Sequence, residues 1–363
     1  MSRIPYLAPE AMTEPQLRRS RELEALRGGK PVTGPGAFWL RNPAISGCAE
    51  PMRQHMERNT SLPLALSELA ILMTARHWSA TYAWCRHEPQ VLKAGLSAAA
   101  VAALRDGRDA DFADEPATIV QAVARSLLQT GGLDDATYGR ALTAFGLPRL
   151  VELISEVGYG CLVSLANTIF EPDSPEGAHD YLPAAAPPRA PVERPARAPR
   201  LATSPDADSQ AGRIDLIGVT GFAWRQCPKI AEYARGYDET LRLHLSMAPG
   251  TCALVVLLVA RYWQASSVWP GLARFASASG IDAPTIAAVS CGDRPHTMSD
   301  EQALAYDFAS ELLTAGRPSD ATFARAREGL GLTVMTEIPA IVGFLTMIAL
   351  TANVFVSADG PVA

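Results

Sequence analysis

Paired cysteines are the first feature that this sequence lacks. None of its six cysteines belongs to a CxxC motif or to a spacing typical of a disulfide framework; they are Cys48, Cys85, Cys161, Cys227, Cys252 and Cys291. Such thiols are typical of a reducing compartment. The N-terminus, Met1 to Glu10, also lacks a basic start followed by an apolar core. Together these absences predict a cytoplasmic protein.

Excess positive charge and the common catalytic motifs are missing too. The chain has 32 Lys and Arg against 38 Asp and Glu, so its net charge of −6 disfavours nucleic acid or an anionic membrane as a partner. It contains no glycine-rich phosphate loop, no GxSxG motif and no HxxxH or HxxE metal spacing. We therefore expect no metal. No stretch alternates apolar and polar residues for long enough to indicate a sheet, so the prediction is all-α.

What the sequence does contain is one pattern written twice. Ala75-Arg76-His77-Trp78 recurs 185 residues later as Ala260-Arg261-Tyr262-Trp263, and at the same offset Trp84 matches Trp269. Gly146 likewise matches Gly331. A constant offset over about a hundred residues indicates a tandem duplication.

A proline-rich stretch separates the two copies. Nine of the 28 prolines lie between Pro172 and Gln210, among few large apolar residues. This composition is typical of an extended linker with polyproline II character, and a ligand for a peptide-recognition domain is the alternative. The predicted domains are residues 1–171 and 211–363, with a linker over 172–210.

Capping residues place the helices of the first copy. Ser67 is expected to cap one helix, and Ser79 or Thr81 to open a second that ends at Gly95. Further helices are expected over 97–107, 117–130 and 135–146. A final long helix should begin at Pro148.

Several of these segments carry a resemblance to a known family. Glu68-Leu69-Ala70-Ile71-Leu72, Ala75-Arg76-His77-Trp78 and Lys93-Ala94-Gly95-Leu96-Ser97, with Tyr82, Trp84 and His87 between them, resemble the carboxymuconolactone decarboxylase family. The resemblance covers residues 7–170 and, more faintly, 214–355. It implies two tandem domains with the alkylhydroperoxidase D-like helical fold, acting on a small molecule.

The redox branch of that fold is disfavoured by the residues present. In the alkylhydroperoxidase branch a Glu is followed by a CxxC pair at 12 and 15 positions and by a His at 19. Glu68 and His87 match, but Ala80 and Ala83 stand at the cysteine positions. Dithiol chemistry needs both thiols. Cys85 points away from this helical face, so we interpret it as a small buried hydrophobe, with a single-cysteine peroxidase as the alternative.

Glu68 and His87 are the candidate catalytic residues. A neutral imidazole can carry a proton to or from carbon, and a carboxylate can orient it. The decarboxylase branch implies loss of CO2 from a small lactone acid and reprotonation of the enolate, without a cofactor. His87 would donate the proton, and Arg76 or Arg86 would hold the substrate carboxylate. The alternative is a structural pair that joins two helices.

The second copy helps to sort the other candidates. Glu68 becomes Ala253 and His87 becomes Leu272, so the second copy is predicted to be degenerate. Tyr82 becomes Ser267, which favours Tyr82 as a substrate-binding residue along with Trp84, Arg76 and Arg86.

Residues retained in both copies are more simply explained by folding. Arg76 recurs as Arg261, Trp84 as Trp269 and Trp39 as Trp224, so a structural role is the alternative for each of them. His77 is interpreted as a packing residue.

One apolar segment, residues 338–356, is about as long as a membrane span. Its counterpart, residues 154–170, contains Glu156 and Asn167 and is unsuited to lipid, so we interpret both as buried helices.

Members of the carboxymuconolactone decarboxylase family form rings of identical subunits, and the apolar surface of 338–356 suits a protein interface. We therefore expect a homo-oligomer, such as a trimer of tandem chains. A non-catalytic scaffold that binds an apolar small molecule remains a third interpretation of the whole chain.

Overall fold

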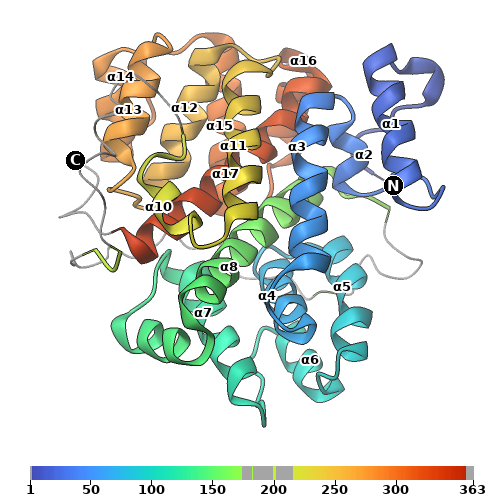
Figure 1. The fold of residues 1–363 in the computed structure, drawn as a ribbon. Helices are drawn as coiled ribbons and strands as arrows, with labels where there is room; N and C mark the ends of the chain where they lie inside the picture. The colour runs from blue at the N-terminus through green and yellow to red at the C-terminus, as the bar shows by residue number, and fades with distance from the viewer. Residues whose placement is uncertain (1, 174–181, 183–198, 202–215, 357–363) are drawn as a thin grey trace.

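In the computed structural model, residues 2–173, 182, 199–201 and 216–356 are described, and every regular element among them is a helix. The predicted all-α class is therefore confirmed (Figure 1). Most of the predicted linker, residues 172–210, lies outside the described residues.

The first half is a run of helices that ends in one very long helix. Its elements are α1 (Glu14–Leu26), α2 (Pro35–Trp39), α3 (Pro43–Gln54), α4 (Leu64–His77), α5 (Thr81–Lys93), α6 (Ala98–Arg105), α7 (Glu115–Thr130) and α8 (Asp135–Phe170), with short turns of 3-10 helix at Pro9–Ala11 and π helix at His55–Asn59. The side chains of Ser97 and Asp134 accept backbone N–H groups at the starts of α6 and α8, which fixes where these helices begin.

The second half repeats these bounds. Its elements are a 3-10 turn at Gly218–Thr220, then α10 (Gly221–Trp224), α11 (Pro228–Leu243), α12 (Pro249–Tyr262), α13 (Trp269–Ala278), α14 (Ala283–Cys291), α15 (Asp300–Ala315), α16 (Asp320–Gly329) and α17 (Gly331–Phe355). When 185 is added to the residue numbers, the first and last residues of α4 coincide with those of α12, and those of α7 with those of α15. Ser79 and Gln264, at the same offset, both have a φ of 53°.

Two sequence-based boundaries need correction or refinement. The helix assigned to a Ser67 cap begins earlier, at Leu64 after Pro63, and the Ser67 hydroxyl donates to the Met56 carbonyl instead. Pro63 stands at the N-cap with φ −52° and ψ 136° and makes no side-chain cap bond, so a search for capping side chains misses this start. The predicted break near Gly146 is a kink within α8, where Gly146 adopts φ 71° and ψ 164°.

The long helices α8 and α17 lie side by side at the centre of the molecule (Figure 1). A Cβ on Gly158 of α8 would lie 2.7 Å from the Met347 Cα, and one on Gly343 of α17 would collide with the Leu162 Cα. Gly158 and Gly343 are equivalent at the offset of 185, and so are Leu162 and Met347. Only glycine allows backbones to approach this closely, so the crossing is nearly symmetric and the two halves share one core.

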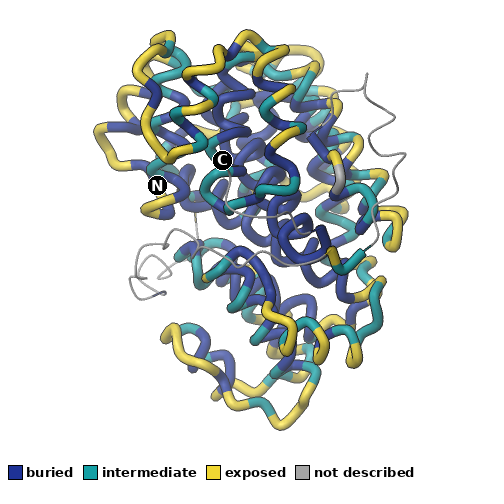
Figure 2. Tube along the Cα trace, turned by 90° about the vertical axis from the view of Figure 1, so that its left-hand side faces the viewer, coloured by how far each residue is buried: buried dark blue, intermediate teal, exposed yellow. Residues whose placement is uncertain are grey.

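Burial of these helices accounts for their apolar character. By length and composition α8 and α17 could each cross a membrane, but 89% and 100% of their apolar windows are buried inside the protein. Figure 2 shows buried segments running through the middle of the molecule. The segment 338–356 is thus buried, as predicted, but it is covered by α8, α12 and neighbouring helices of the same chain. The homo-oligomer remains a prediction, without the support of an exposed oily face.

Candidate functional site

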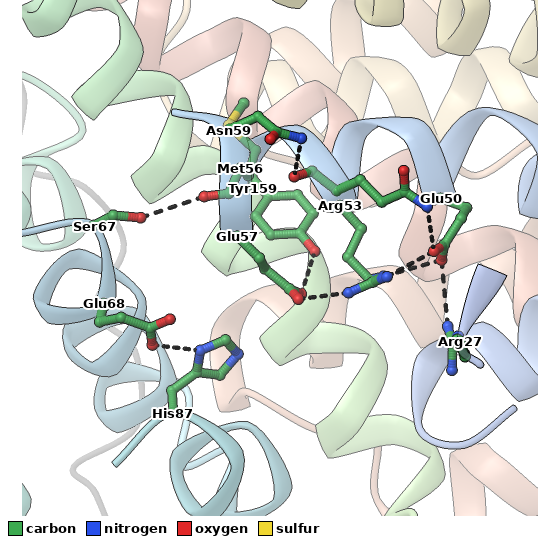
Figure 3. A network of polar contacts seen from close by, with 11 residues as sticks. Arg27, Glu50, Arg53, Met56, Glu57, Asn59, Ser67, Glu68, His87 and Tyr159 are labelled. Carbon is green, nitrogen blue, oxygen red and sulfur yellow. Dashed lines mark hydrogen bonds and ion pairs between the residues drawn. The ribbon is translucent and has the colours of Figure 1, made fainter. Parts of the chain in front are cut away.

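The two candidate catalytic residues lie on adjacent helices joined by a tight turn. The turn at Ser79 folds α5 back against α4. This brings His87 Nδ1 to 2.7 Å from Glu68 Oε2, with the two side chains 13% and 5% exposed (Figure 3). Because a carboxylate only accepts hydrogen bonds, Nδ1 carries the proton, and in the neutral imidazole Nε2 has the lone pair. In Figure 3, Nε2 lies on the side of the ring that faces Arg53 and Glu57.

The Glu68–His87 pair borders an open cavity of about 890 Å³. Its walls come from α1 to α5 and from α8, so they are all built by the first half. Of the residues proposed from sequence to bind substrate, Tyr82 and Arg86 line this cavity, whereas Arg76 and Trp84 do not. The possible redox residue, Cys85, does not line it either. Tyr82 donates a hydrogen bond to the Thr33 hydroxyl, 3.2 Å away.

Arg76 lies against the turn that follows α6. A Cβ on Gly107 would lie 3.3 Å from the Arg76 guanidinium, and one on Gly292 would lie 3.4 Å from that of Arg261. Burial lowers the pKa of Arg76. The same arrangement in both halves, one of which lacks the acid/base pair, favours a structural role for Arg76.

Trp84 and His77 are also placed away from the cavity. Trp84 is fully buried, as expected for a core aromatic. Burial, followed by the nearby Arg76 charge, lowers the pKa of His77 to about 4. His77 is therefore neutral near pH 7.

Cys85 sits in an environment that favours the thiol. Its partial burial, and then the charge of Glu88, raise the pKa of the Cys85 thiol. The thiolate is the reactive form, so this environment weakens the case for a single-cysteine peroxidase. The positions that hold cysteines in the redox branch, Ala80 and Ala83, are buried, and Ala83 lines the cavity.

A charged network forms the wall opposite His87. The Arg53 guanidinium bonds Glu50 at 2.6 and 3.0 Å and Glu57 at 2.6 Å, and Arg27 lies 3.3 Å from Glu50 (Figure 3). Tyr159 on α8 donates to Glu57 at 3.1 Å. Burial works to raise the pKa of Glu50, but the bonds from Arg53 outweigh it and hold the pKa at about 2. The network thus joins α3 to the following π turn and to α8 along this wall.

The cavity also has cations that are free to attract a ligand. Within the described part of the chain, Lys30, Arg58 and Arg86 form no ion pair, and all three are exposed residues that line the cavity. Arg53, by contrast, is neutralised by its two carboxylates. The rim thus has a positive character suited to a small anion.

Like Glu50 and Tyr159, Asn167 is a buried residue of the cavity wall that was not a site candidate from sequence. Asn167 lies on α8, is 3% exposed, and has no hydrogen-bond partner for either amide atom among the described residues. The sequence signal for Asn167 is a polar residue within an otherwise apolar helix. Such a residue is expected to be buried, and buried polar groups nearly always have hydrogen-bond partners, which can be a ligand.

The second half lacks this chemistry. Ala253 and Leu272, which replace Glu68 and His87, are both buried in the core. Within the described residues, no group of three or more His, Cys, Asp and Glu side chains could hold a metal ion.

Comparison with protein-family models finds no match, and neither does comparison with curated proteins. The function therefore has to be argued from the geometry of the site.

Proposed function

We propose that this protein is an acid–base enzyme that moves a proton at a carbon atom of a small, carboxylated or enolisable substrate. The observation that carries this proposal is the 2.7 Å bond between His87 Nδ1 and Glu68 at the edge of an open cavity. A His–carboxylate pair in a cavity is the usual arrangement for general base catalysis. The cationic rim supports an anionic substrate such as a lactone acid or keto acid.

The proposed reaction follows from the tautomer of His87. Its Nε2 lone pair accepts the proton from the carbon next to a carbonyl, and the C–H electrons pass to the carbonyl oxygen to form an enolate. The imidazolium, stabilised by Glu68, then returns the proton to carbon. In a decarboxylating reaction the C–CO2 bond breaks to give the enolate, and a protonated His87 supplies the proton. Side chains alone can carry out this transfer.

We further infer that the chain arose by tandem duplication of an alkylhydroperoxidase D-like domain, as in the carboxymuconolactone decarboxylase family. The recurring helix bounds and the paired glycines Gly158 and Gly343 support this inference. In this proposal the first half keeps the active site, while the second half is degenerate and serves as a structural partner.

The test is uptake of solvent deuterium, together with CO2 release, across a panel of small lactone acids and β-keto acids. His87→Gln and Glu68→Gln should each lower the rate by about a hundredfold or more. His77→Gln is the matched control, because this histidine lies outside the cavity and should leave the rate unchanged. Wild-type protein that is inert on the whole panel, or folded variants as active as wild type, would refute the acid–base function and leave the binding-scaffold interpretation.

A further inference from the structure

The cavity wall formed by α8 is a stripe of three residues at helical spacing. Tyr159, Val163 and Asn167 all line the cavity, and residues four apart fall on one face of a helix. The Tyr159 hydroxyl is already bonded to Glu57. The Asn167 amide is therefore the polar group of this stripe whose hydrogen bonds are still unmade.

The second half shows what this stripe looks like without a site. At the offset of 185, Phe344, Ile348 and Ala352 of α17 replace the three residues, and all are buried. The fold therefore does not require a polar residue at this position. The amide of Asn167 is an addition in the half that keeps the Glu68–His87 pair.

An unpaired amide in this position is costly to the folded protein. Each buried donor or acceptor without a partner lowers the stability of a folded protein by about 1–3 kcal/mol. Such groups are rare in native proteins, so each one calls for an explanation. Asn167 leaves both Nδ2 and Oδ1 unmatched within the described chain. A bound ligand that offers one acceptor and one donor would satisfy both.

We infer that Asn167 is the substrate-binding residue that holds the oxygen of the reacting group, an inference that rests on the proposed function for the nature of that oxygen. Nδ2–H donates to a carbonyl oxygen or to the enolate oxygen derived from it, and Oδ1 accepts from the hydroxyl of an enol or of a neighbouring carbon. The class of substrate is thus a hydroxy-carbonyl or enolisable carbonyl compound, whose anionic end faces Lys30, Arg58 and Arg86.

The amide strengthens its hold as the reaction proceeds. When His87 removes a proton from carbon, negative charge moves onto the oxygen bonded to Nδ2. A hydrogen bond to a charged acceptor is about twice as strong as one to a neutral acceptor, so Asn167 favours the enolate over the ketone. Aspartate cannot replace it, since an ionised carboxylate has no donor.

p-Nitrophenol is a suitable probe because its neutral and ionised forms mimic an enol and an enolate and differ in visible absorption. Wild-type protein should bind both forms. Asn167→Leu should weaken phenolate binding about ten- to a hundredfold, the worth of one charged hydrogen bond. Asn167→Asp should retain the phenol and lose the phenolate. Ser164→Ala is the matched control, because Ser164 is a buried residue of α8 with an unpaired hydroxyl outside the cavity, and it should bind as wild type does.

Thermal stability separates a binding role from a structural one. Asn167→Leu removes unmatched polar atoms, so its melting temperature without ligand should equal or exceed that of wild type. A markedly lower melting temperature would overturn the inference, and so would unchanged p-nitrophenol affinity in Asn167→Leu. Failure of wild type to bind the probe would overturn it too.

The inference and the proposed function fail in different ways. Wild-type protein that binds p-nitrophenol through Asn167 but exchanges no proton would refute the acid–base function alone. Proton exchange that is lost in His87→Gln and unaffected in Asn167→Leu would refute the role of Asn167 alone.

Discussion

Glu152 and Glu337, 185 residues apart, hold the same loop in the two halves of the chain. Glu152 accepts the backbone N–H of Ser61 at 2.9 Å, and Glu337 accepts that of Ser246 at 2.8 Å. Each serine stands three residues before a central helix, α4 or α12. Glu337 also accepts an amide N–H of Asn42 at 2.7 Å. It thereby ties the start of α3 in the first half to the second half.

Loss of the Glu337 carboxylate should therefore destabilise the whole molecule. Glu337→Ala removes the acceptor of the Ser246 and Met247 N–H groups. It also removes one of the two acceptors of the Asn42 amide, which keeps its bond to the His244 carbonyl. We expect the free energy of unfolding to fall by about 2–4 kcal/mol, measured by urea denaturation. Glu328→Ala, at an exposed position on α16, should change it little. Equal stability of the two variants would contradict the assigned role of Glu337.

The charged wall of the cavity should make stability depend on acid pH through Glu50. Its pKa of about 2 in the folded protein lies below the ordinary value of 4.5. A depressed carboxyl pKa contributes stability that is complete above pH 4.5 and is lost as the pH falls from 4.5 towards 2. Glu50→Gln should lower stability at pH 7 and flatten its loss over this range, as followed by thermal melts. Glu22→Gln, at an exposed surface pair, should leave the slope as in wild type.

Much of the fold could be predicted because it rests on local rules. The caps Ser97 and Asp134 and the turn at Gly131 mark helix ends in the sequence as they do in the structure. The start of α4 was missed because Pro63 begins it without a side-chain cap. The close crossing at Gly158 and Gly343 depends on helices brought together from the two halves, which no local pattern records.

The candidate site likewise has a part that depends on local sequence and a part that depends on tertiary packing. The pairing of Glu68 and His87 is expected from the resemblance, since the related family has a Glu and a His at this spacing. The structure brings them together because one tight turn joins their helices. The network of Arg27, Arg53 and Tyr159 draws on the end of α1, on α3 and on α8. Its members lie far apart in the chain. Tertiary packing alone brings them to one cavity.

The helix crossing should be intolerant of a single added methyl group. Gly158→Ala and Gly343→Ala would each drive a Cβ into the facing backbone of the other long helix, so we expect a loss of about 2 kcal/mol or more. Gly139→Ala, in α8 with nothing within 4 Å of the added Cβ, is the control and should be neutral or stabilising. Comparable melting temperatures for all three variants would show that the helices can separate at little cost.

Cys85 should behave as a slow thiol. Its raised pKa keeps the thiolate fraction low at pH 7, so a thiol reagent should label it more slowly in native protein than in a denatured sample. The exposed Cys291 provides an internal reference for fast labelling, with mass mapping to separate the two sites. Rapid, selective labelling of Cys85 would revive the peroxidase alternative.

The α8–α17 crossing also changes how the molecule responds to dilution. Two separate chains joined through such a contact would dissociate at low concentration, but here both helices belong to one polypeptide, so dilution does not separate this contact. Each molecule therefore contains one first half and one second half. Under the proposed duplication, the second half can lose its own acid and base while α11 and Glu337 still contact α3, the helix that carries Arg53.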